Sequence, residues 1–227
     1  MIARGIDGCR GGWIAVSIDA ADRRDFAIFS AIAEVLVLGA ATTMIDIPIG
    51  LPERGYRGCD REARRLLKGA ASRVFLGLRR PLLGCLSDYP AANAWGKKTD
   101  GKGLAKQAFN ILPKIAEVDA VITPALQERF RESHPELVFA RMNGGTPLAS
   151  KHEAEGLRQR HDLLMRHGFA ALDAWLARLR GTGAKPDDLY DACVLALAAR
   201  DAMAGDAQRI GAGEARDAKG LRMEIWY

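Results

Sequence analysis

The sequence predicts an α/β fold: a mixed five-stranded sheet with helices on both faces and an inserted irregular and helical segment. Three observations predict this class. First, two short apolar runs flank a glycine-rich turn near the N-terminus. Second, a third apolar run follows them. Third, a helix-length stretch then leads to a run at 42–47 that is apolar almost throughout. Such a run is typical of a strand covered on both faces. The strand-helix-strand order favours a parallel pair, which makes the sheet mixed.

Turn and cap chemistry place the first elements. Gly8, Gly11 and Gly12 allow positive φ, so the chain can reverse there into a hairpin. Ser30 stands where a helix N-cap belongs, just ahead of an apolar helical face. The elements expected in this part are strands at 2–7, 13–18, 26–29 and 42–47 and a short helix that begins after Ser30.

Caps, prolines and apolar spacing place the remaining elements. We expect one domain over residues 1–227, with the insertion at about 53–103. The expected elements are a helix capped by Asp60, a helix at 104–112 stopped or kinked at Pro113, a helix from Thr123-Pro124 to about Arg131, a strand at 134–139, a helix from a capping box at Ser150 towards Gly168, a helix at 169–180, a helix that starts at Lys185-Pro186 and a strand at 221–227.

Composition limits the class of protein. The chain of 227 residues is 48% apolar, which is enough to bury a core, yet no stretch approaches a membrane span and the N-terminus lacks a signal-peptide pattern. We therefore expect a cytoplasmic protein with no membrane partner. The four cysteines are widely spaced and include no Cys-x-x-Cys pair, which favours reduced thiols over a zinc site or a disulfide framework.

The distribution of charge indicates an anionic partner. The net charge of +5 is modest, but nine basic residues and only two acidic ones lie between Arg54 and Arg80. Basic side chains supply most of the sequence-independent affinity for nucleic acid, so we predict that this segment contacts phosphates. A solvated helix face with a loop is the alternative. The predicted nucleic-acid contacts are Arg10, Arg57, Arg61, Arg64, Lys114 and Lys151.

Acidic residues stand at the ends of expected strands and at the start of the last expected helix. Mg²⁺ and Mn²⁺ prefer carboxylate oxygens, so acids gathered by a sheet could hold one or two such ions. The predicted catalytic residues are Asp7, Asp46, Glu136, Asp188 and Asp191, and the predicted metal ligands among them are Asp7, Asp46 and Asp191.

Each of these acids also has a structural alternative. Asp7 and Asp46 could each fix the turn that follows its strand, and Glu136 could face solvent from an edge strand. Asp188 would suit the first turn of a helix because of the helix dipole. Asp191 lies deeper in the same helix, where capping no longer explains it, so we expect it to be functional.

Motifs that span nearly the whole chain resemble a known family. They are Gly5–Trp13, Ile45–Pro52, Cys59–Arg64, Pro113–Asp119, Ser133–Glu136, Asp188–Ala192 and Gly220–Tyr227. The chain resembles at these motifs the domain of unknown function 429, a family of uncharacterised proteins that are predicted ribonuclease H-like nucleases. The resemblance implies a fold in which acids on the first and fourth strands and on the last helix hold metal ions. The segment from Asp188 is also similar to the closing helix of Holliday-junction resolvases of that fold.

Three functions remain open from the sequence. The first is a metal-dependent nuclease that hydrolyses phosphodiester bonds with Mg²⁺ or Mn²⁺. The second is an ATPase or phosphotransferase of the actin and sugar-kinase type, which the chain fits less well because it has one glycine-rich hairpin and is short for two lobes. The third is a non-catalytic nucleic-acid-binding module of the same fold. The sequence does not decide between DNA and RNA, and it leaves a homodimer open.

Overall fold

The computed structural model describes residues 1–211, 213 and 216–227. The chain divides into two compact units. Unit 1 comprises residues 1–46, 129–208 and 226–227, and unit 2 comprises residues 47–128 and 209–225. The insertion expected at about 53–103 lies within unit 2, whereas a single domain over 1–227 stays a prediction. Among the described residues, no helix is both long and apolar enough to cross a membrane.

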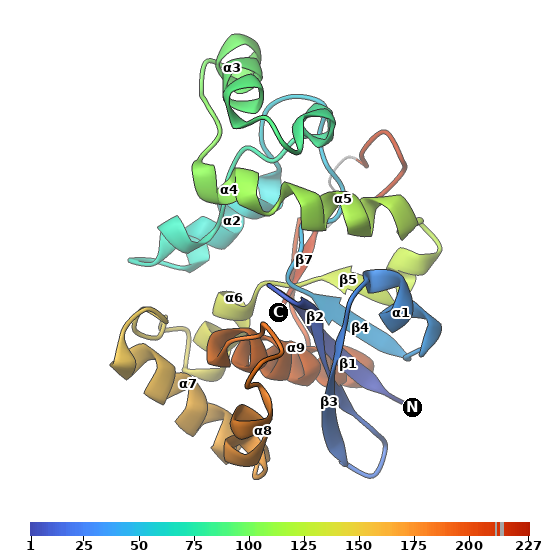
Figure 1. The fold of residues 1–227 in the computed structure, drawn as a ribbon, viewed down its shortest axis with the longest axis vertical. Helices are drawn as coiled ribbons and strands as arrows, with labels where there is room; N and C mark the ends of the chain where they lie inside the picture. Colours follow the sequence, from blue (N-terminus) through green and yellow to red (C-terminus); the bar gives the residue numbers. More distant parts are fainter. Residues whose placement is uncertain (212, 214–215) are drawn as a thin grey trace. The chain divides into compact units, whose positions relative to one another are not determined.

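Unit 1 is built on a five-stranded mixed sheet (Figure 1). Its strands lie in the order β3-β2-β1-β4-β5, with β1 antiparallel to β2 and parallel to β4. The strands are β1 Ala3–Cys9, β2 Gly12–Ile18, β3 Arg24–Phe29, β4 Thr42–Ile45 and β5 Phe130–Glu132. The predicted hairpin, third strand and parallel pair are therefore confirmed, and the strand order matches a ribonuclease H-like fold.

Helices cover both faces of this sheet, as expected. The helices of unit 1 are α1 Ile32–Val37, α6 Pro135–Met142, α7 Ala154–Arg166, α8 Leu172–Arg178 and α9 Pro186–Ala204. Side chains alternate between the faces along a strand. Gly5 of β1 faces α9, because a Cβ there would lie 2.2 Å from the carbonyl oxygen of Ala192. Arg4 faces the other side, where its Nη1 donates to the carbonyl oxygen of Val35 in α1 at 3.4 Å.

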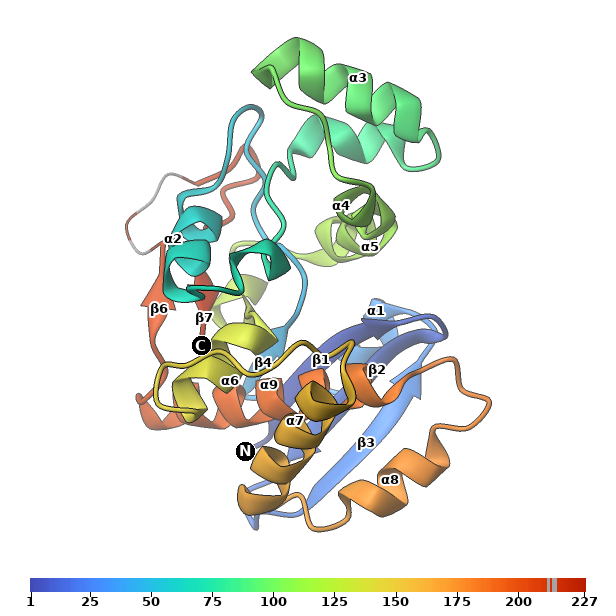
Figure 2. The same cartoon turned by 90° about the vertical axis from the view of Figure 1, so that its left-hand side faces the viewer.

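The core of unit 1 lies between the sheet and α9, which packs against β1, β2 and β4 (Figure 2). Residues 189–199 of α9 are all buried, and four of them are alanines, which let the helix backbone approach the sheet closely. Ile14 and Val16 of β2 and Met44 of β4 belong to the same core. Asp191 lies within this buried stretch, so its carboxylate is held against the sheet.

The strand expected at 134–139 is wrong, because this segment forms the helix α6. His134 caps the helix: its Nδ1 accepts a hydrogen bond from the backbone N–H of Glu136 at 3.3 Å. Pro135 suits the first helical position, where no donor is needed. A short apolar run cannot distinguish a buried helix from a strand by spacing. The fifth strand is β5 instead, so the helix expected from 123 to about 131 shortens to the 3-10 turn η3, Leu126–Glu128.

Two helix starts in unit 1 also differ from expectation. The N-cap of α1 is Ala31 rather than Ser30, whose hydroxyl donates to Glu34 instead. The N-cap of α7 is Glu153, so the helix begins later than the capping box predicted at Ser150. The last main helix begins at Pro186, as predicted.

Unit 2 is largely helical. Its elements are α2 Gly58–Leu66, η1 Ala71–Arg73, η2 Arg80–Cys85, α3 Tyr89–Asp100, α4 Lys106–Asn110, α5 Leu112–Val121, η3 and the strand β6 Arg209–Ile210, which pairs with β7 Ile225–Trp226. Asp60 lies inside α2 rather than at its cap, which is Arg57. Pro113 stands at the start of α5, so it begins a helix instead of ending one.

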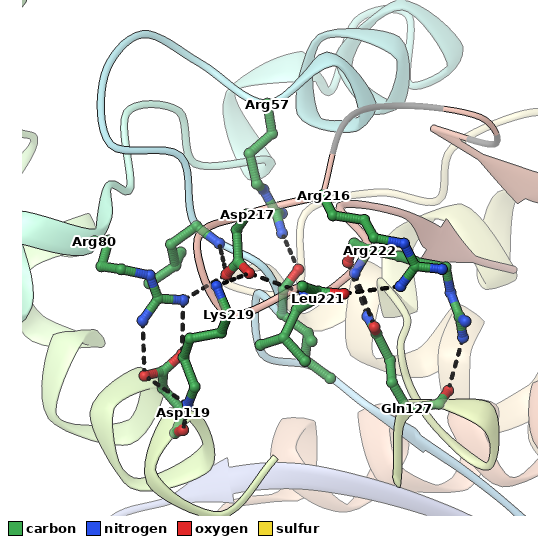
Figure 3. Close-up of polar contacts among 12 residues, drawn as sticks. Arg57, Arg80, Asp119, Gln127, Arg216, Asp217, Lys219, Leu221 and Arg222 are labelled. Carbon is green, nitrogen blue, oxygen red and sulfur yellow. Dashed lines mark hydrogen bonds and ion pairs between the residues drawn. The ribbon is translucent and has the colours of Figure 1, made fainter. Parts of the chain in front are cut away.

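Polar contacts in unit 2 join segments that are far apart in the sequence (Figure 3). Asp217 accepts hydrogen bonds from the backbone N–H of Leu51 at 3.0 Å and from the guanidinium of Arg80. Arg80 also pairs with Asp119 at 2.9 Å. Lys219 in turn pairs with Asp119 at 3.2 Å. These basic side chains are therefore part of the internal structure of unit 2.

Candidate active site

Two aspartates lie side by side where β1 and β4 meet. The parallel register pairs Ile6 with Ile45, and the backbone N–H of Asp46 donates to the carbonyl oxygen of Ile6 at 3.1 Å. Asp7 and Asp46 are thus the next pair along these strands. Side-chain alternation puts both on the face of the sheet that α9 covers. Asp7 is buried, and its Oδ1 accepts the backbone N–H of Gly8 at 2.7 Å.

A third aspartate reaches the same place from α9. Asp191 is 2% exposed, and its Oδ2 accepts a hydrogen bond from the ammonium of Lys151 at 2.7 Å. Its other oxygen, Oδ1, is buried and has no hydrogen-bond partner. Asp187 lies one helical turn earlier and is 3.6 Å from the same ammonium. The helix therefore presents two carboxylates to Lys151.

Electrostatics show that these acids share one environment. Burial raises the pKa of Asp7 well above its ordinary value, and the charges of Asp46 and Asp191 raise it further. Burial also raises the pKa of Asp46. Burial raises the pKa of Asp191 to about 7, although Lys151 opposes the shift. The three carboxylates thus carry more negative charge than their surroundings neutralise, and the site favours either protons or an added cation.

Lys151 supplies positive charge to this cluster. Burial alone would lower the pKa of its ammonium, but the charges of Asp191, Asp7 and Asp46 raise it above the ordinary lysine value. Sequence reasoning predicted Lys151 as a phosphate contact. The structure instead places its ammonium among the acids, where it is a partner of the carboxylates.

Glu136 lies near the three aspartates, but its carboxylate is engaged in an ion pair. It is 6% exposed and forms an ion pair with Arg160, which is fully buried. Arg160 also donates to the carbonyl oxygens of Ala149 and Gly156 at 2.9 and 2.8 Å. The pair therefore fixes the chain on both sides of Lys151. The charge of Glu136 still raises the pKa of Asp191.

Asp188 has a structural partner at the start of α9. Its Oδ2 accepts the backbone N–H of Lys185 at 2.8 Å, as in a capping box. Burial raises the pKa of Asp188, and the hydrogen bond from Lys185 opposes that rise. Asp188 is near enough to raise the pKa of Asp7. Asp187, rather than Asp188, joins Asp191 within ion-pair distance of Lys151.

The part of the chain that carries the sheet and the acid cluster matches a known protein family. The family profile described as "Protein of unknown function (DUF429)" matches residues 5–216. The chain belongs to this family. It matches no curated protein and no solved structure.

Two predicted phosphate contacts of this DUF429 chain, Arg57 and Arg64, bind partners inside unit 2. Arg57 is 2% exposed, and its guanidinium pairs with Asp60 at 2.5 Å and donates to the carbonyl oxygen of Ile49. Arg64 donates to the carbonyl oxygen of Val74 at 2.9 Å. Arg57 is therefore corrected to a structural residue, because an internal ion pair leaves it no exposed charge.

The other predicted contacts are more accessible. Arg10 is exposed in the turn between β1 and β2 of unit 1. Arg61 is exposed in α2, with its guanidinium 5.3 Å from the ring centroid of Tyr56. Lys114 is partly buried in α5. Arg10 and Arg61 are thus the predicted contacts that keep an outward charge.

The sequence-based prediction missed four lysines of the DUF429 chain, three of which lie in the polar run at 96–103. Among the described residues, none of these exposed lysines forms an ion pair: Lys97, Lys98, Lys102 and Lys106. Tyr89, the first residue of α3, donates to the carbonyl oxygen of Leu104 at 3.0 Å, so the segment after α3 folds back along the helix. Lys97 and Lys98 lie in the last turn of α3, and Lys106 lies near its start. Lys106 lies 4.3 Å from the ring centroid of Tyr89. We call these four residues the lysine surface.

The acid cluster fits a divalent cation by charge and by donor type. The donors are carboxylate oxygens, which Mg²⁺ and Mn²⁺ prefer, and Asp191 Oδ1 is buried without a partner. Within the described residues, no three His, Cys, Asp or Glu side chains already converge as a closed ligand set. Closing the set around an ion therefore requires side-chain rotation at Asp7, Asp46 or Asp191.

Proposed function

We propose that this DUF429 chain is a metal-dependent nuclease that hydrolyses phosphodiester bonds of DNA or RNA. The observation that carries the proposal is the unpartnered Oδ1 of Asp191 beside two more carboxylates with raised pKa, Asp7 and Asp46. Buried carboxylates without compensating charge are costly to the fold, so their retention favours a role in binding a cation. The ribonuclease H-like order of strands supports the same reaction class.

Asp7, Asp46 and Asp191 would hold Mg²⁺ or Mn²⁺ through their carboxylate oxygens. When bound, such an ion lowers the pKa of water and stabilises charge on a phosphate during hydrolysis. The chain contributes the backbone elements that bring its donors together. Two come from neighbouring strand ends and one from a helix packed directly on those strands, so the donors are held by rigid elements.

Basic residues near the acids have separate tasks in this proposal. The ammonium of Lys151 reduces the net negative charge that an incoming phosphate would meet. The ion pair of Arg160 with Glu136 holds the chain that carries Lys151. His134 caps α6 through its Nδ1, so we assign it a structural task rather than that of a base.

We further propose that the lysine surface of unit 2 contacts the nucleic-acid backbone. Its four exposed ammonium groups carry charge that no internal carboxylate neutralises, since Asp100, the acid of this stretch, pairs with Arg79. Lysines that neutralise phosphates release counterions, which supplies affinity without sequence preference. This surface is favoured over the segment from Arg54 to Arg80, because three arginines of that segment, Arg57, Arg79 and Arg80, form ion pairs with acids inside unit 2.

The proposal is tested by cleavage of labelled single-stranded and duplex DNA and RNA, with Mg²⁺, with Mn²⁺ and with a chelator. We expect cleavage that needs the metal and that falls at least about 100-fold in Asp7→Asn. Asp25→Asn, at an exposed position in β3, is the control and should cut like the wild type. Equal rates in Asp7→Asn and wild type, both folded, would contradict the proposal. Salt-dependent binding with no turnover in any metal would favour the non-catalytic module instead.

A further inference from the structure

The two carboxylate oxygens of Asp191 differ in their hydrogen-bond partners. Oδ2 receives the ammonium of Lys151 at 2.7 Å, while Oδ1 is buried and faces no donor. A carboxylate has lone pairs on both oxygens, and a buried oxygen normally finds a partner. Oδ1 of Asp191 is therefore the atom at which a further positive charge would be stabilised.

Lys151 is held firmly enough to be a permanent component of the site. The backbone N–H of Ala149 donates to the side chain of Gln159 in α7 at 2.8 Å, and its carbonyl oxygen accepts from Arg160 at 2.9 Å. The carbonyl oxygen of Ser150, the residue between Ala149 and Lys151, accepts a hydrogen bond from the backbone N–H of Glu153 at 3.0 Å. These three hydrogen bonds involve the two residues just before the lysine and join them to α7 and to its N-cap, so the segment that carries Lys151 is anchored.

The ammonium also has more than one carboxylate to bind. Asp191 and Asp187 project from successive turns of α9 and lie 2.7 and 3.6 Å from it. Asp7 and Asp46 are near enough to interact with it electrostatically. A group that contacts several acids at once occupies the kind of position that a second metal ion takes in a two-metal site.

We propose that Lys151 is the resident second cation of this site, so that the chain binds a single divalent ion. That ion would be held by Oδ1 of Asp191 together with Asp7 and Asp46, while Lys151 stays on Oδ2. This inference rests on the proposed metal site and adds its stoichiometry. It makes Lys151 a positioning residue that sets how many ions the acids accept and how tightly.

The test is Mn²⁺ binding, measured by calorimetry and by electron paramagnetic resonance, which separates isolated from paired Mn²⁺. The proteins are wild type, Lys151→Met, Lys151→Arg and Lys185→Met, the last an exposed lysine at the cap of α9 that removes the same charge. Thermal unfolding with a chelator shows whether each variant is folded. No cleavage assay enters the readout.

We expect one isolated Mn²⁺ per wild-type chain. Lys151→Met should bind its first Mn²⁺ at least about tenfold more tightly, because a like charge within a few ångströms is removed, and should then accept a second Mn²⁺. Lys151→Arg and Lys185→Met should keep a single ion with affinity within about twofold of the wild type.

Two results would overturn the inference. Paired Mn²⁺ in the wild type would show that Lys151 does not take the place of the second ion, and would leave the proposed nuclease intact. Unchanged affinity and stoichiometry in folded Lys151→Met would show that the ammonium has no influence on the metal. Absence of any Mn²⁺ binding by the wild type would overturn the proposed metal site as well.

Discussion

Gly5 of β1 lies directly beneath the backbone of Ala192 in α9. A Cβ at position 5 would come within 2.2 Å of the carbonyl oxygen of Ala192, so only glycine fits this contact. The contact sets the distance between helix and sheet next to Asp191, and it does so two residues before Asp7 in the strand. The approach of the acids to one another therefore depends on the absence of a side chain at Gly5.

Gly5→Ala should push α9 away from the sheet. Overpacking a core commonly lowers the free energy of unfolding by 1 to 3 kcal/mol, and here the obstacle is backbone, so we expect about 3 kcal/mol. Urea denaturation measures the change. Gly84→Ala is the matched control, because a Cβ at that position meets nothing within 4 Å, and it should change stability by less than about 0.5 kcal/mol. A neutral Gly5→Ala would contradict the packing described above.

The metal-free protein should lose stability as the pH rises. The carboxyl pKa is higher in the folded chain than in the unfolded one at Asp7, Asp46 and Asp191. Such groups contribute stability that is complete below their unfolded pKa, near 3.8, and is lost as the pH rises through the folded value, about 7 for Asp191. Denaturation with a chelator at about pH 5 and about pH 8 should differ by about 1 to 3 kcal/mol.

Asp191→Asn is the comparison that assigns this pH dependence. An amide does not ionise, so the variant should lose less stability than the wild type between the two pH values. Mg²⁺ should stabilise the wild type more at the higher pH, where it competes with fewer protons. An identical pH dependence in Asp191→Asn and wild type would show that Asp191 is not the group responsible.

The buried ion pair of Glu136 with Arg160 should matter most when only one partner is removed. Arg160→Met leaves the carboxylate of Glu136 uncompensated, so we expect a loss of about 3 to 5 kcal/mol in the free energy of unfolding. Glu136→Leu and the double variant complete a double-mutant cycle. We expect a coupling energy of about 2 kcal/mol, whereas additive losses would mean that the two charges do not depend on each other.

Lys106→Glu should weaken nucleic-acid binding by about threefold to tenfold at low salt and flatten its salt dependence. Fluorescence anisotropy without metal measures binding separately from cleavage. Lys68→Glu makes the same charge change at an exposed site within the basic segment of 54 to 80, so it discriminates between the two surfaces. The reverse ranking, with Lys68→Glu the more damaging, would return the nucleic-acid contact to that segment.

The sequence was sufficient for the first four strands of the sheet and for the pair of strand-borne acids. Glycines placed the hairpin, and the strand-helix-strand order placed β4 parallel to β1, so the neighbouring positions of Asp7 and Asp46 followed. Local signals misled at several helix starts, where the predicted caps were wrong, and at 134–139, where two structures share one pattern. The apolar run after His134 fits a buried helix as well as a strand, and the cap by His134 is visible only in coordinates.

The ion pairs of the site and of unit 2 could not be predicted in the same way. Arg80 pairs with Asp217 and Arg160 with Glu136, and the partners are far apart in the sequence. A single sequence shows where charges are numerous but not which of them are already neutralised. For the same reason the first turn of α9 did not reveal whether Asp187 or Asp188 would contact Lys151.

The most direct test of the central claim is a crystal of the protein soaked in Mn²⁺ and measured at the manganese absorption edge. We predict an anomalous peak at about 2.0 to 2.4 Å from carboxylate oxygens of Asp7, Asp46 and Asp191, with Oδ1 of Asp191 among them. The peak should be missing from crystals of Asp191→Asn treated in the same way. An empty map at these three residues in wild-type crystals, or manganese bound only elsewhere, would contradict the account.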